Sequence, residues 1–73
     1  MNKGGIIMER KTLIKLLKDH CDTFLTEDEM NFEELIKAVF FIDPFAMLSD
    51  AVYCVNNVLE QYAKIQDGTL NHW

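Results

Sequence analysis

Apolar residues recur three and four positions apart along most of this chain, which is the spacing of one face of an α-helix. The longest such run, here called the third-helix seam, consists of Phe45, Leu48, Val52, Val55, Leu59 and Tyr62. Ala51, Val58 and Ile65 flank the seam on one side, so the apolar arc covers about half of the helix circumference. An arc of that width predicts a helix with a large area to bury.

Residue types at both ends of the run indicate where this helix starts and stops. Asp43 suits an N-cap, and Pro44 suits the first helical position, where its missing N–H costs no hydrogen bond. Gly68 suits the left-handed backbone conformation that closes a helix. We therefore predict a helix over residues 44–66, the longest in the chain.

Two shorter helices are predicted before it. The first covers residues 8–22, and its inward face carries Leu13, Ile14, Leu16, Leu17, Cys21 and Phe24. The apolar face of the second consists of Phe32, Leu35, Ile36, Val39 and Phe40. The second helix ends at the Asp43-Pro44 pair, because a residue that precedes proline disfavours helical geometry.

The start of the second helix is ambiguous. Thr26 with Glu29, and Asn31 with Glu34, both show the three-residue spacing of a capping box. The helix therefore begins at residue 27 or at residue 32, and we predict a span near 28–42.

Together these elements predict an all-α fold, a small three-helix bundle with a long C-terminal helix. One helical domain would span residues 8–68, between a flexible N-terminal arm at 1–7 and a C-terminal tail at 69–73. The predicted core consists of Leu13, Leu17, Phe24, Leu35, Ile36, Val39, Phe40, Leu48, Val52, Val55 and Leu59.

The width of the third-helix seam and the length of the chain also favour self-association. The chain has 73 residues, and a single core of that size supplies only about 3–5 kcal/mol. Two short helices leave part of a wide apolar arc uncovered, so we expect a homodimer that completes the bundle. The apolar interface would consist of Phe41, Phe45, Leu48, Val52, Val55, Leu59 and Tyr62.

Charge is unevenly distributed. The net charge is −5, which disfavours non-specific binding to nucleic acid or to an anionic membrane. Residues 1–19 hold five basic and two acidic side chains, a net +3, whereas residues 20–73 hold two basic and ten acidic ones, a net −8. This asymmetry suggests contact between the two halves, between subunits, or with a charged partner.

Two charged sets within this layout each have two interpretations. The acidic run consists of Asp22, Glu27, Asp28, Glu29, Glu33 and Glu34. It either supplies helix-end carboxylates, or forms a surface that imitates nucleic-acid phosphates and occupies a basic groove. A basic stripe is formed by Lys11, Lys15 and Lys18, and it is either a solvated helix face or a set of phosphate contacts.

No pattern of catalytic or metal-binding residues is visible. His20 and Cys21 are neighbours, but adjacent helical residues point about 100° apart and form no nucleophile–base pair by proximity. The possible zinc ligands His20, Cys21, Cys54 and His72 lack the usual short spacing. A disulfide between the two cysteines stays an alternative to two free thiols. We expect no enzyme, no cofactor, no metal and no small-molecule substrate, and a cytoplasmic protein without a membrane span.

Two classes of function remain. The first is a non-enzymatic protein-binding regulator or inhibitor that occupies the surface of a partner, and phage-encoded inhibitors of host proteins are analogous in size and charge. Its acidic run would form the contact rim, and its apolar centre would come from Phe32, Phe41 or Phe45. The alternative is a dimeric nucleic-acid-binding transcriptional regulator that uses the basic first helix.

Overall fold

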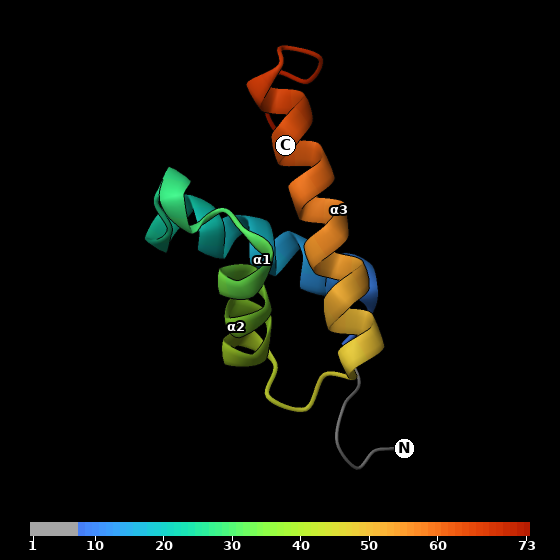
Figure 1. Ribbon diagram of the computed structural model, residues 1–73. Coiled ribbons are helices and arrows are strands. Elements are labelled where there is room, and N and C mark those ends of the chain that lie inside the picture. The colour runs from blue at the N-terminus through green and yellow to red at the C-terminus, as the bar shows by residue number, and fades with distance from the viewer. Residues whose placement is uncertain (1–7) are drawn as a thin grey trace.

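Three helices form where the apolar periodicity predicts them, and the computed structural model describes residues 8–73 (Figure 1). They are α1 (Arg10–Phe24), α2 (Phe32–Ile42) and α3 (Leu48–Gln66), with a short 3-10 turn η1 (Glu27–Glu29) after α1. Each helix contacts the other two, and no strand forms within residues 8–73. The predicted all-α three-helix bundle is confirmed, while the arm predicted at 1–7 lies outside the described residues.

α1 lies across both other helices, and α3 extends well past α2 towards the C-terminus (Figure 1). Gly68 ends α3 with a backbone φ of 85°, the left-handed conformation predicted for it, and its N–H donates to the Ile65 carbonyl over 3.2 Å. The chain then turns back, and Trp73 packs against the core.

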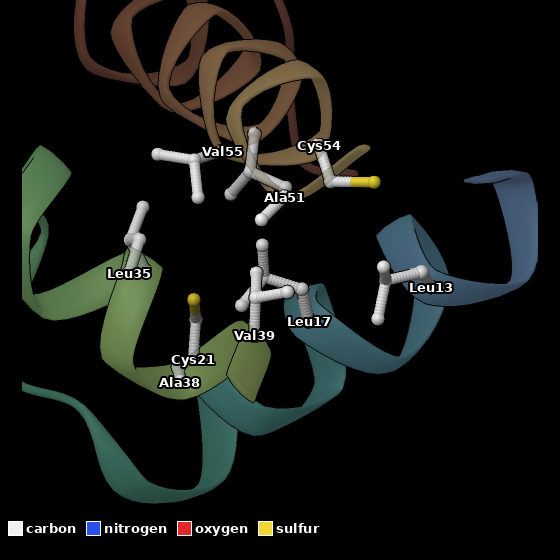
Figure 2. Packing of buried hydrophobic residues seen from close by; sticks show 10 residues of the cluster. Leu13, Leu17, Cys21, Leu35, Ala38, Val39, Ala51, Cys54 and Val55 are labelled. Carbon is white, nitrogen blue, oxygen red and sulfur yellow. The ribbon is translucent and has the colours of Figure 1, made fainter. Parts of the chain in front are cut away.

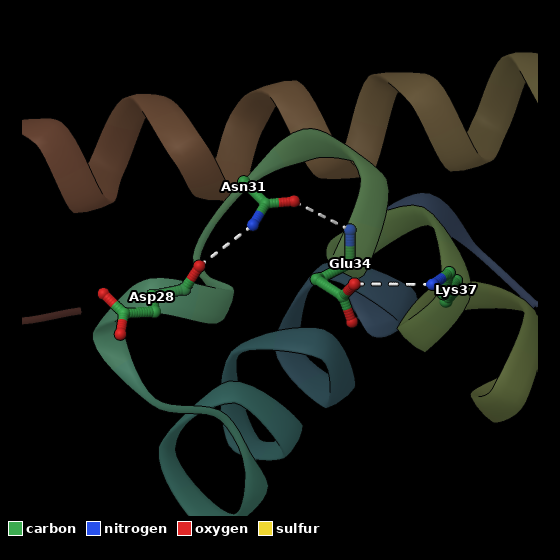
Figure 3. Close-up of polar contacts among 4 residues, drawn as sticks. All are labelled: Asp28, Asn31, Glu34 and Lys37. Carbon is green, nitrogen blue, oxygen red and sulfur yellow. Dashed lines mark hydrogen bonds and ion pairs between the residues drawn. The ribbon is translucent and has the colours of Figure 1, made fainter.

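Both predicted capping signals before α2 form hydrogen bonds, one at the start of η1 and the other at the start of α2. The Glu29 carboxylate accepts hydrogen bonds from the Thr26 backbone N–H over 2.9 Å and from the Thr26 hydroxyl over 3.1 Å, which closes η1. Asn31 accepts from the Glu34 N–H over 3.0 Å and caps α2 (Figure 3). α2 therefore begins at residue 32, the later of the two starts, and the predicted span near 28–42 is four residues too long at its N-terminal end.

The predicted start of the third helix at residue 44 is wrong, because Asp43 and Pro44 build a turn instead. The Asp43 carboxylate accepts from the Phe45 N–H over 3.2 Å, and the Asp43 carbonyl accepts from the Ala46 N–H over 3.1 Å. Pro44 thus occupies the second position of a four-residue turn, where its fixed φ is equally suitable. α3 begins four residues later, at Leu48.

The core lies where the three helices meet (Figure 2). Its buried residues are Leu13, Leu17 and Cys21 of α1, Leu35, Ala38 and Val39 of α2, and Ala51, Cys54, Val55 and Val58 of α3. The predicted core positions Leu13, Leu17, Leu35, Val39 and Val55 are confirmed. Ile36, Phe40, Val52 and Leu59 are only partly buried.

Two predicted core residues are wrong: Phe24 is 68% exposed and Leu48 is 65% exposed. Phe24 is the last residue of α1, beyond the point where the other helices cover it. Leu48 shares the face of Val55, two turns further along, but it is the first residue of α3 and lies at the uncovered end of that face. The buried face instead includes the small residues Ala51 and Cys54, which let α1 approach closely: the Cys54 thiol lies 3.7 Å from the Arg10 carbonyl.

Cys21 and Cys54 are both buried free thiols, so the disulfide alternative is not formed. Burial raises the pKa of the Cys21 thiol to about 11, with a further contribution from the negative charge of Asp22. Burial likewise raises the pKa of Cys54. Both groups are therefore neutral in the folded chain at pH 7.

These thiols predict a loss of stability in alkaline solution. In the unfolded chain a thiol ionises at a pH of about 8.5, whereas folded Cys21 retains its proton until about 11. The free energy of unfolding should therefore fall as pH rises through that window, because only the unfolded state releases the proton. Urea denaturation at a series of pH values measures the slope. Replacing both cysteines by alanine should flatten it, and an unchanged slope would contradict the assignment.

Candidate protein-binding surfaces

A cluster of three exposed or half-buried aromatic rings spans α1 and α2, and we call it the aromatic cluster. It consists of His20, Phe24 and Phe41. The His20 ring centroid lies 4.9 Å from that of Phe24 and 5.6 Å from that of Phe41. His20 and Phe24 meet because residues four apart lie on one face of α1. The two phenyl rings are 68% and 76% exposed, so most of this apolar surface faces solvent.

Charged side chains lie at the edge of the aromatic cluster. His20 and Phe41 share a shallow hollow with Leu25, Ala38, Glu34 and Lys37. The Glu34 carboxylate pairs with the Lys37 ammonium over 3.4 Å along α2 (Figure 3). The surface therefore has an apolar centre and a polar rim, which is the general anatomy of a protein–protein interface.

The acidic run divides into carboxylates with internal roles and carboxylates without them. Glu29 closes η1 and Glu34 pairs with Lys37, which agrees with helix-end chemistry for these two. The Asp22 carboxylate accepts from the Trp73 indole N–H over 3.1 Å. No side-chain hydrogen bond or ion pair within residues 8–73 involves the carboxylates of Glu27, Asp28 or Glu33, all of which are exposed.

Residues of the acidic run also face different ways. Glu34 lies beside the aromatic cluster, between α1 and α2. Asp22 and Glu27 instead line a second hollow with Tyr62 and Trp73, near the C-terminal end of α3. The run is therefore not one continuous patch.

Most of the proposed dimer interface on α3 is used inside the monomer. Val55 is fully buried, so it belongs to the core and is not available to a partner. Val52, Leu59 and Tyr62 are partly buried, and only Phe41, Phe45 and Leu48 remain strongly exposed. Phe32, the third predicted aromatic contact, is 45% exposed. The homodimer stays a prediction. The part of the seam that remains exposed for such a contact lies mainly at the N-terminal end of α3.

The basic stripe lies along a groove between α1 and α3, which we call the lysine groove. It is lined by Lys11, Lys15 and Lys18 together with Ile14, Asp19, Asn57, Gln61 and Trp73. The predicted lysines are thus gathered at one surface, but the residues facing them from α3 and the tail were not predicted. Nothing in the local sequence shows that Trp73 folds back to this position.

His20 and Phe24 were missed as surface residues for a different reason. Their four-residue spacing on α1 is visible in the sequence, but Phe24 was predicted to lie in the core, and His20 was considered only as a catalytic or metal-binding residue. Phe41 was assigned correctly as an exposed aromatic residue. The position of Phe41 beside His20 depends on how α2 packs on α1.

Comparisons with protein-family models, with curated proteins and with solved structures found no match. Among residues 8–73, no group of three or more His, Cys, Asp or Glu side chains is placed to hold a metal ion. No helix in the same range is long and apolar enough to cross a bilayer.

Proposed function

We propose that this protein is a non-enzymatic protein-binding regulator or inhibitor that acts by occupying the surface of a partner protein. The observation that carries the proposal is the aromatic cluster. The core of the monomer is apolar, yet Phe24 and Phe41 remain 68% and 76% exposed to solvent. An exposed group of large apolar side chains with a polar rim is typical of an interaction site.

The aromatic cluster can supply most of the affinity of such a contact. Fully burying one phenylalanine side chain stabilises a complex by about 1.5–3 kcal/mol. Aromatic residues at the centre of an interface also tend to dominate the measured binding energy. Phe24 and Phe41 are attached to helices rather than to loops, so little conformational entropy is lost when a partner covers them.

Acidic side chains would act on the rate of encounter. Glu27, Asp28 and Glu33 are exposed, and the chain as a whole carries a net charge of −5. Such a layout favours a partner with a basic surface, including one that normally binds nucleic acid. Exposed carboxylates raise the association rate more than they raise net affinity, because their desolvation offsets much of the pairing.

The decisive experiment is affinity capture from the source cell with two matched baits, the native chain and the Phe24→Ala, Phe41→Ala variant. A protein retained by the native chain and lost from the variant is the expected result. Phe45→Ala, which removes another strongly exposed ring outside the cluster, serves as the control. Equal capture by all three baits would show that the aromatic cluster is not the binding surface.

Kinetics with the captured partner should separate the two contributions. Phe41→Ala should speed dissociation by about 30-fold, as expected for the loss of a 2 kcal/mol contact. Changing Glu27 and Asp28 to Gln and Asn should slow association and flatten its salt dependence, with dissociation nearly unchanged. Glu60→Gln, on an exposed part of α3, is the matched charge control. The electrostatic part of the proposal fails if association keeps its salt dependence.

The alternative is a dimeric nucleic-acid-binding regulator, and the lysine groove is the observation in its favour. Three lysines line the same groove as Trp73, and basic side chains with an aromatic ring suit a single strand. Asp19 in the same groove and the net charge of −5 oppose it. A gel-shift assay at low salt with mixed DNA and RNA tests this alternative, which requires binding that weakens steeply as salt rises.

A further inference from the structure

The charge on one flank of α1 changes from positive to negative along the helix. Lys11, Lys15, Lys18 and Asp22 lie at positions i, i+4, i+7 and i+11, so they share one face of the helix. Glu27 and Asp28 follow in η1, and Glu27 lines one hollow with Asp22 at the end of that face. The flank is therefore positive over its first part and negative at its end.

This order of charges is unfavourable for α1 alone. The positive end of a helix dipole lies at its N-terminus, where carboxylates stabilise, and the negative end lies at its C-terminus, where basic groups stabilise. The first turn of α1 has no acidic residue and its last turn has no basic one. The last turn instead contains Asp22, and Lys11 lies in the first.

The monomer provides little compensation for these charges. Arg10 in the first turn pairs with Asp50 of α3 over 2.6 Å and lies over the Tyr53 ring. The other ion pair within residues 8–73 is between Glu34 and Lys37, so none involves the three lysines of the groove or the carboxylates at the far end of the flank.

The two oppositely charged surfaces adjoin at Trp73. This residue lines both the lysine groove and the hollow that contains Asp22 and Glu27. Its indole donates to Asp22, and its ring centroid lies 6.2 Å from that of Tyr62. Trp73 therefore places partly exposed apolar surface between the positive and the negative region.

We propose that this flank of α1 binds a second copy of the chain, with the two α1 helices antiparallel about a two-fold axis near Trp73. In that arrangement Lys11 and Lys15 of each copy face Glu27 and Asp28 of the other, and the contact occurs twice. Antiparallel packing also brings the N-terminal end of each helix dipole near the acidic end of the other helix. Trp73 of both copies supplies the apolar centre.

Charge complementarity favours a second copy over nucleic acid as the occupant. A phosphate backbone would meet the lysines but would also meet Asp19 and Asp22, whereas a second copy pairs both signs. The net charge of −5 per chain opposes association at long range. At 0.1 M salt, however, charges separated by more than about 10 Å are largely screened, so the paired charges in direct contact dominate.

A dimer built on this flank of α1 leaves the aromatic cluster free to bind a partner protein. The aromatic cluster lies on the α2 side of α1, whereas the lysine groove lies on the α3 side. A dimer built on the charged flank would therefore present two copies of the aromatic cluster. Failure of one proposal would not imply failure of the other.

Sedimentation equilibrium of the full chain at several salt concentrations tests the proposal. We expect twice the mass of the chain at about 0.1 M salt, where the long-range repulsion is screened, and a fall towards the monomer mass as salt rises further. The Lys11→Glu, Lys15→Glu, Lys18→Glu variant and the Glu27→Lys, Asp28→Lys variant should each be monomeric. A 1:1 mixture of these two variants should recover the dimer mass, because opposite charges again face each other across the two-fold axis. Glu60→Lys should leave the native mass unchanged.

Several results would overturn the proposal. A native chain that stays monomeric at about 0.1 M salt over a wide concentration range contradicts the proposal without any variant. Loss of the dimer in Leu48→Glu but not in the lysine variant would move the contact to the third-helix seam. A lysine variant that loses binding to single-stranded DNA while the native chain remains monomeric would assign the groove to nucleic acid.

Discussion

Replacing Val55 by aspartate should unfold the isolated chain, whereas replacing Leu48 by aspartate should leave it folded. Both residues belong to the third-helix seam, but Val55 is fully buried and Leu48 is 65% exposed. A carboxylate at position 55 would lie among apolar side chains without a partner, at a cost of several kcal/mol. A chain of this size has only about 3–5 kcal/mol of core stability to lose.

Far-UV circular dichroism and thermal unfolding of the two variants measure the difference. Helical signal lost in Val55→Asp and retained in Leu48→Asp is the expected pattern. Val55→Asp cannot test a dimer built on the seam, because it damages the monomer itself. Leu48→Asp perturbs only the exposed end of the seam, so its effect on mass is interpretable. A folded Val55→Asp chain would show that α3 does not pack on the face described here.

Replacing Leu17 by alanine should destabilise the fold by about 2–5 kcal/mol, the range for truncating a fully buried leucine. Leu17 is completely buried at the centre of α1, where it faces α2 and α3 (Figure 2). Leu16 provides a matched control in the same helix, because it has the same side chain and is 37% exposed. Leu16→Ala should cost less, since less apolar surface leaves the protein interior and no closed cavity forms.

Urea denaturation gives both free energies of unfolding on the same scale. Both variants replace a leucine by alanine in the same helix, and the two residues differ in helix propensity by only a few tenths of a kcal/mol. The effect of helix propensity on the free energy of unfolding therefore nearly cancels between the two variants. The difference between them therefore reports packing. Equal destabilisation by the two substitutions would contradict the orientation of α1 in the core.

The sequence by itself determined the number, type and order of the helices. Periodic apolar residues define helices in water because each helix must bury one face. Local signals also located several boundaries, since they depend on atoms a few residues apart. Gly68 closes α3 because it can adopt a positive φ, and Asn31 caps α2 because its side chain reaches the Glu34 N–H. The buried positions Leu13, Leu17, Leu35, Val39 and Val55 followed from the same periodicity.

Only the tertiary structure decided which edge of each apolar face is covered. Asp43 and Pro44 suit a turn as well as a helix start, and the sequence contains no signal that separates the two. Phe24 and Leu48 continue apolar faces but lie where no neighbouring helix covers them. The aromatic cluster and the lysine groove are assembled from residues far apart in the chain, so they depend on how three helices pack. Helix packing is set by side-chain shape and by small residues such as Ala51, which periodicity does not encode.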